Sequence, residues 1–116
     1  MVRKLKLSEK HLKFLRVKGE SMQPTIVDGA LLLLDTRDEG HKFPRVRSGP
    51  ARRTMAPSIY VFHQRGMGYR VKRIERIDEN AAFLISDNLA EHPPEMVSVN
   101  EGVTIIGRVA WWDNVL

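Results

Sequence analysis

Residues 17–35 read VKGESMQPTIVDGALLLLD, in which a turn-forming segment runs into a block of leucines. The leucine block is short and bounded by turn residues, which predicts a buried β-strand. Ahead of it, Gly19 can adopt backbone angles that are denied to other residues, while Pro24 fixes its own φ and biases Gln23 away from helix. Ser21 is therefore expected on a sharply shaped turn at the start of a buried strand, with its hydroxyl exposed.

The rest of the chain predicts an all-β, mainly antiparallel fold. Apolar residues alternate or cluster in short runs instead of recurring at helical spacing. Helix is expected only as short turns, near residues 8–13 and 22–27. The candidate strands, which suit one compact sheet system, are residues 12–17, 30–35, 58–63, 69–77, 82–86 and 103–112.

A chain of 116 residues has room for one hydrophobic core. We expect a lead-in segment at residues 1–14 and one domain at residues 15–116, into which a mobile basic loop is inserted at residues 37–57. The absence of cysteine excludes disulfides and makes the cytoplasm the expected location. The longest apolar run, residues 30–34, is too short to span a membrane, so no membrane association is expected.

Charge is unevenly distributed along the chain. Residues 37–76 carry 11 basic and 3 acidic groups, whereas residues 77–116 carry 1 and 7. A basic segment of this kind is compatible with nucleic-acid binding, but no stacking aromatic residues are interleaved with it. We therefore interpret it as a solvated loop and rank a nucleic-acid-binding module below the other functions.

A nucleophilic serine needs a base, for which histidine and lysine are the candidates. Of the four histidines only His63 ends a predicted strand, and together they lack metal-ligand spacing, so neither a histidine-based triad nor a metal is expected. A lysine acts as base only when neutral, which requires burial to lower a pKa of ~10.4. Lys72 is the candidate because strand alternation places it on the same face as Ile74. The pattern alone favours the other interpretation, in which Lys72 is one of several solvated cations on an edge strand.

Taken together, four segments resemble the LexA-type serine peptidases. This family includes self-cleaving bacterial and phage repressors and UmuD-like proteins, with type I signal peptidases as distant relatives. The segments, in chain order, are VKGESMQPTIVDGALLLLD like the nucleophile box, IYVFHQRGMGYRVKRI like the lysine box, LISDN like a later loop and IIGRVAWW like the closing strand. The resemblance covers residues 15–112 and implies the fold of the LexA C-terminal domain and of signal peptidases.

The resemblance implies a Ser-Lys dyad that needs no cofactor and acts on a peptide segment. Ser21 would be the nucleophile and Lys72 the general base, with the backbone N–H of Ser21 helping to bind the oxyanion. Gly19, Met22 and Pro24 would shape the site. The loop of Ser86, Asp87 and Asn88 resembles one that borders the signal peptidase site, but we expect these residues first of all to form a turn.

The family also implies a biological setting. The chain would be the C-terminal peptidase-type and dimerisation domain of a phage-like or LexA-like transcriptional repressor, bound to DNA only through an N-terminal domain absent here and triggered by a recombinase filament, as in the SOS response. It contains none of the Ala-Gly or Cys-Gly bonds that self-cleaving relatives cut, so self-cleavage of this chain is not expected. The alternatives are a stand-alone peptidase acting in trans and a catalytically silent dimerisation module.

Homodimerisation is expected through the C-terminal strands. Trp111 and Trp112 are adjacent on a predicted strand, so their side chains face opposite ways. One can enter the core while the other offers an apolar anchor to a partner.

Overall fold

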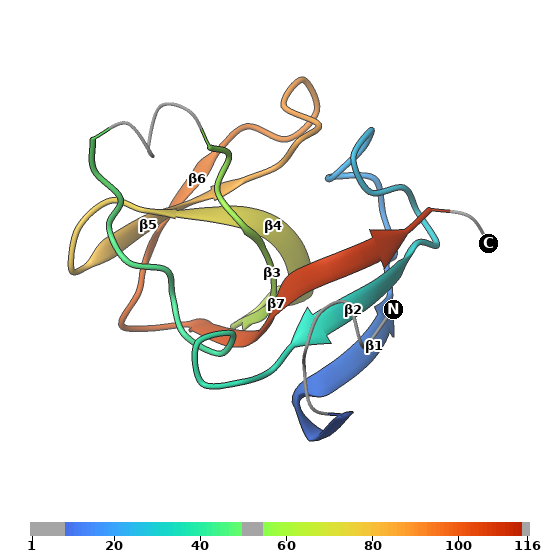
Figure 1. Ribbon diagram of the computed structural model, residues 1–116. Coiled ribbons are helices and arrows are strands. Elements are labelled where there is room, and N and C mark those ends of the chain that lie inside the picture. The colour runs from blue at the N-terminus through green and yellow to red at the C-terminus, as the bar shows by residue number, and fades with distance from the viewer. Residues whose placement is uncertain (1–8, 50–54, 115–116) are drawn as a thin grey trace.

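The computed structural model describes residues 9–49 and 55–114, and its framework is a single antiparallel sheet of seven strands (Figure 1). One short 3₁₀ turn, η1 (Glu9–His11), leads into the first strand. The strands are β1 (Leu12–Arg16), β2 (Leu31–Asp35), β3 (Ile59–Gln64), β4 (Gly68–Arg76), β5 (Ala81–Ile85), β6 (Glu95–Ser98) and β7 (Val103–Asp113). The expected all-β class is confirmed.

The sheet has the strand order β1-β2-β7-β3-β4-β5-β6, so β7 lies between two strands that are distant from it in sequence. The ladders shift register between Leu33 and Leu34 and between Val61 and Phe62. Bulges of this kind bend a sheet and increase its twist. The sheet curls accordingly, as Figure 1 shows, and β1 and β6 form its two edges.

Six of the seven strands lie where the sequence predicts strands. The seventh, β6, was not predicted because its four residues, EMVS, carry only a weak alternation, and Met96 is 67% exposed. It forms because the fold places these residues beside β5, with which they pair. The expected helical turn at residues 22–27 is a series of turns in the structure, and the one at residues 8–13 is reduced to η1.

The core consists of two clusters, which take alternate residues of β3 and so lie on its two faces. The first gathers residues of β2, of β3 and β7 and of the turn that contains Met22 and Ile26. The second gathers apolar residues of β3, β4, β5 and β7 around Phe62, which is fully buried. Because β2 belongs to the centre of the fold, four of its five residues are buried, as its unbroken leucine run predicts.

The described part of the predicted basic loop lies against the sheet. Arg37 pairs with Asp35, and Arg47 pairs with Glu75 of β4. Phe43 packs against the second core cluster. Residues 50–54 of this loop lie outside the described residues, as do residues 1–8 of the predicted lead-in segment. The expected domain start at residue 15 falls inside β1.

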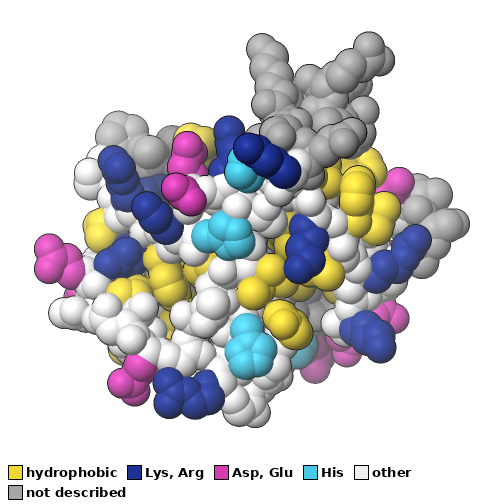
Figure 2. Space-filling model, turned by 90° about the horizontal axis from the view of Figure 1, so that it is seen from below, with side chains coloured by type: hydrophobic (Ala, Val, Ile, Leu, Met, Phe, Trp, Pro, Cys, Tyr) yellow, Lys and Arg dark blue, Asp and Glu magenta, His cyan; other side chains and the backbone are white. Residues whose placement is uncertain are grey.

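Charges of both signs are interspersed on the face of the molecule that Figure 2 shows, with hydrophobic side chains exposed between them near its centre. No helix among the described residues has the length and apolar character needed to cross a membrane.

Candidate functional site

The turn that carries Ser21 is held closed by hydrogen bonds at its base. Gly19 adopts a φ of 100°, which favours glycine, and its N–H donates to Asp28 Oδ1 over 2.8 Å. The N–H of Ile26 donates to the carbonyl of Met22 over 2.9 Å. These bonds fix the path of the chain on both sides of Ser21, which is itself partly exposed.

Lys72 is buried in the middle of the sheet. It lies on β4, between β3 and β5, and its exposure is only 2%. It stands opposite Tyr60 in the ladder and shares a buried face with Ile74. The interpretation of Lys72 as a solvated cation on an edge strand is therefore wrong, because β5 and β6 continue the sheet beyond β4.

The environment of Lys72 favours its neutral form. Burial lowers the pKa of Lys72 below the ordinary lysine value, because the charged ammonium loses its hydration. The positive charge of Arg70 lowers this pKa further, and the carboxylate of Glu95 partly opposes the shift. The Lys72 Nζ donates a hydrogen bond to Ser86 Oγ over 2.5 Å, and Ser86 is itself only 1% exposed. The amine is thus held in place by a buried neutral partner.

The segment after β5 fastens the Ser21 turn to the sheet. The backbone N–H of Asn88 donates to the carbonyl of Ser21 over 3.0 Å, and its side-chain amide donates to the carbonyl of Glu20 over 3.2 Å. Thr25 donates its hydroxyl proton to Asp87, which also forms an ion pair with Arg73 of β4. The turn and the strand that carries Lys72 are therefore linked through residues 86–88.

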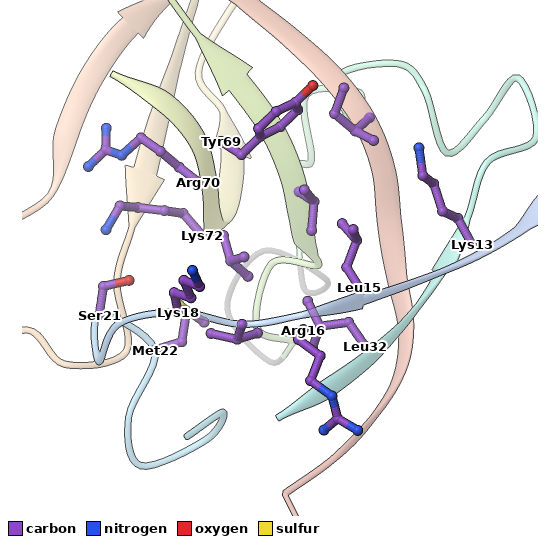
Figure 3. Close-up of a pocket in the computed structure, with 14 residues that line it drawn as sticks. Lys13, Leu15, Arg16, Lys18, Ser21, Met22, Leu32, Tyr69, Arg70 and Lys72 are labelled. Atoms are coloured by element: carbon purple, nitrogen blue, oxygen red, sulfur yellow. The ribbon is translucent and has the colours of Figure 1, made fainter. Parts of the chain in front are cut away.

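Ser21 and Lys72 open into the same pocket. This pocket has a volume of about 650 Å³ and lies between β1 and β4. In Figure 3 the Ser21 hydroxyl and the Lys72 amine lie at the same end of it. Among the described residues, Lys72 Nζ is bonded to Ser86 and not to Ser21. A nucleophile and its base are often loosely aligned before substrate binds.

The backbone around Ser21 offers a donor for a developing negative charge. No group among residues 9–49 and 55–114 accepts a hydrogen bond from the Ser21 N–H. An unused N–H on the residue that carries the nucleophile is the usual first member of an oxyanion hole.

The other predicted site residues differ in how close they come to the pocket. Met22 is 2% exposed and lines the pocket beside Ser21. Gly19 and Pro24 do not line it; Gly19 has a positive φ, and the peptide bond between Gln23 and Pro24 is cis.

Trp111 and Trp112 lie on β7, do not line the pocket, and face opposite sides of the sheet. The indole of Trp112 donates to the carbonyl of Thr25 over 3.1 Å and packs against the first core cluster. Trp111 pairs with Leu33 of β2 and does not belong to that cluster.

The described residues contain no group of three or more side chains that could hold a metal ion. The pocket itself offers a hydroxyl, an amine biased towards its neutral form and a free backbone N–H.

A serine and a buried lysine that share one pocket of an antiparallel β-fold are the kind of arrangement used by serine peptidases with a lysine base. Comparison with protein families matches residues 1–110 to the family described as Peptidase S24-like, and the chain belongs to this family. The resemblance to LexA-type serine peptidases is thereby confirmed. Comparison with curated proteins finds no match to this chain.

Several residues of the site were not predicted from the sequence. Ser86 was expected to form a turn, but it is the hydrogen-bond partner of Lys72. Tyr69 and the lysines of β1 and the turn, Lys13 and Lys18, were not singled out, although they line the pocket. Strand alternation gives no signal for the two lysines, because a separation of five residues places side chains on opposite faces of a strand and Lys18 lies beyond the end of β1.

Proposed function

We propose that this domain is a serine peptidase in which Ser21 is the nucleophile and Lys72 the general base. The observation that supports this most strongly is the position of Lys72: its amine is buried, its pKa is lowered by burial, and it opens into the pocket that contains Ser21. Burial of a charged lysine costs free energy because the ammonium group loses its hydration. In a lysine that only stabilised the fold, an ion pair with a carboxylate would be expected to offset this cost.

The proposed reaction needs only these groups. Neutral Lys72 takes the proton of the Ser21 hydroxyl while the oxygen attacks the carbonyl carbon of a peptide bond. The Ser21 N–H donates to the oxyanion of the tetrahedral intermediate. Protonated Lys72 then gives its proton to the departing amine, which leaves an acyl-enzyme. Water attacks this ester, Lys72 takes the proton of the water, and the proton returns to Ser21 as the carboxylate product is released.

A mixed peptide library, analysed by mass spectrometry of the products, tests this proposal. The wild-type domain cleaves a subset of the peptides, and faster as the pH rises because more Lys72 becomes neutral. Ser21→Ala and Lys72→Met each lower the rate on the order of 10³-fold or more. Lys42→Met, which removes an exposed lysine outside the pocket, cleaves like wild type. Cleavage that survives Ser21→Ala or Lys72→Met contradicts the dyad.

We further propose that the domain is the C-terminal part of a LexA-like or phage-like repressor. Support comes from membership of the Peptidase S24-like family and from the four motifs in their expected order. In this setting a helix-turn-helix domain supplies DNA binding, and a peptide linker supplies the substrate. The encoding locus tests this assignment: an in-frame helix-turn-helix followed by an Ala-Gly linker supports the repressor, and its absence favours the stand-alone peptidase that acts in trans. No cleavage of any peptide, with dimerisation retained, favours the silent module.

The proposed dimer is supported by a row of apolar residues across three strands. Phe14 of β1 pairs with Leu33 of β2, which pairs with Trp111 of β7. Leu33 is fully buried, so the residues of this row that a partner could contact are Phe14, which is 54% exposed, and the partly exposed Trp111. Large apolar side chains in such a row are typical anchors of an interface. Sedimentation velocity at micromolar concentration should give a dimer, and Phe14→Glu should convert it to a monomer. Met96→Glu, a change at an exposed residue on β6, should leave the dimer intact, and a monomeric wild type contradicts the proposal.

A further inference from the structure

The pocket around Ser21 is strongly basic. Its lining includes two lysines besides Lys72 and two arginines, and no acidic residue. The basic lining residues are Lys13, Arg16, Lys18, Arg70 and Lys72. Since Lys72 is biased towards its neutral form, the charge that a ligand meets comes from the other four.

These four cations differ in how much of their positive charge is left uncompensated by other groups of the protein. Arg70 forms an ion pair with Glu95 over 2.6 Å and also donates to Gln64, so much of its charge is compensated. Arg16 donates to the carbonyl of Gly29, and in Figure 3 its guanidinium points away from Lys72. Lys13 and Lys18 are exposed, and neither has a carboxylate partner among the described residues. They are the main source of uncompensated positive charge in the pocket.

The two lysines stand at different places along the pocket. In Figure 3, Lys18 lies at the end of the pocket that carries Ser21, and Lys13 lies at the opposite end. Lys13 belongs to β1, and Lys18 follows it by five residues, so an extended chain separates them by roughly 17 Å. Because β1 is an edge of the sheet, its outer side can receive the backbone of an extended peptide.

The pocket floor between the two lysines is apolar. It is formed by one side chain from each of five strands, namely Leu15, Leu32, Val61, Val71 and Ile106. An extended ligand would therefore meet a cation near the serine, then apolar side chains, then a second cation.

We propose that the pocket selects acidic peptides: one carboxylate side chain close to the scissile bond pairs with Lys18, a second four residues along the extended peptide, and so on the same side of it, pairs with Lys13, and apolar residues lie between them. This inference rests on the proposed peptidase function, from which the occupant is taken to be a peptide. Charge complementarity supports it, since nothing acidic in the pocket lining competes for the two ammonium groups.

A single-stranded nucleic acid is the other anionic ligand that such a pocket could attract. Binding of that kind relies on several aromatic side chains on which bases stack. The pocket lining contains one aromatic residue, Tyr69, and its floor is aliphatic. The lining therefore favours an acidic peptide.

Fluorescence anisotropy on the Ser21→Ala protein tests the inference without catalysis. The probes are three labelled peptides of one apolar sequence in which two positions, four residues apart and so on the same side of an extended peptide, carry Glu, Gln or Lys. The Glu peptide should bind most tightly, and its affinity should fall between about 50 mM and about 500 mM salt as the charges are screened. Lys13→Glu and Lys18→Glu should each weaken it ~3- to 10-fold and strengthen the Lys peptide. Lys42→Glu, outside the pocket, should change neither.

Equal binding of the three peptides, or no effect of salt on the Glu peptide, overturns the inference even if a charge-reversal variant fails to fold. Tighter binding of a mixed-sequence single-stranded DNA than of the Glu peptide overturns it in favour of nucleic acid. A different result would contradict the proposed peptidase function alone. In that case the wild-type domain would bind the Glu peptide with the expected preference but would cleave no peptide of the library.

Discussion

The buried carboxylate of Asp35 should make the stability of this domain strongly dependent on pH. Asp35 is fully buried at the end of β2 and binds two guanidinium groups. Arg37 contacts it over 2.8 Å and Arg108 of β7 over 3.0 Å. The hydrogen bonds from Arg37 lower the pKa of Asp35 from 3.8 to about 2, against the opposing effect of burial.

The size of this effect follows from linkage between proton binding and folding. One pKa unit corresponds to ~1.4 kcal/mol, so the lowered pKa of Asp35 corresponds to ~2.5 kcal/mol of stability near neutral pH. The folded pKa lies below the unfolded one, and the unfolded state therefore binds more protons between them. This contribution is present in full above about pH 5 and is lost as the pH falls through about 4 towards about 2.

Urea unfolding, followed by tryptophan fluorescence at a series of pH values, measures the effect. Asp35→Asn should lose ~2.5 kcal/mol at neutral pH, and its difference from wild type should shrink as the pH approaches about 2. Asp38→Asn, a matched change at an exposed aspartate nearby, should follow the wild-type curve. A constant difference between Asp35→Asn and wild type over the whole pH range would refute this reasoning.

Three further changes test the packing and the site. Phe62→Ala should lower the free energy of unfolding by ~3–5 kcal/mol, because Phe62 is 0% exposed in the second core cluster; a loss below ~1 kcal/mol in urea unfolding would show that the cluster is loosely packed. Gly40→Ala should lower the melting temperature, because an added Cβ would lie 2.0 Å from the Asp35 carbonyl oxygen; an unchanged value contradicts this close approach. Ser86→Ala should lower kcat ~10- to 100-fold with little change in KM, because it frees the Lys72 amine from its partner; a change in KM alone would contradict a positioning role.

Local patterns in the sequence are sufficient to predict most of the sheet. The leucine run of β2 and the alternation along β4 and β7 are properties of consecutive residues, and strands form there. β6 was missed because its existence depends on pairing with β5, which four weakly patterned residues do not reveal. Pairing between distant strands is decided by tertiary packing.

The difference between local sequence pattern and tertiary packing also explains what could be predicted about the site. The turn that carries Ser21 is encoded locally by its glycine and proline. Whether Lys72 is buried or solvated depends on whether β4 is an edge strand, and the pattern of β4 alone favoured the wrong answer. Family resemblance singled out Lys72 as the candidate base, whereas Ser86 became visible as its hydrogen-bond partner only when the loop after β5 was placed beside β4.

The most direct test of the Ser-Lys site is the rate at which a serine-directed phosphonylating reagent modifies the protein as a function of pH, followed by intact mass spectrometry. We expect a single modification at Ser21 whose rate rises with an apparent pKa below the ordinary lysine value, because burial favours neutral Lys72. Lys72→Met should abolish the modification, and Lys42→Met should preserve it. Modification of Ser21 at the same rate and with the same pH profile in Lys72→Met, or none in wild type, would contradict the account.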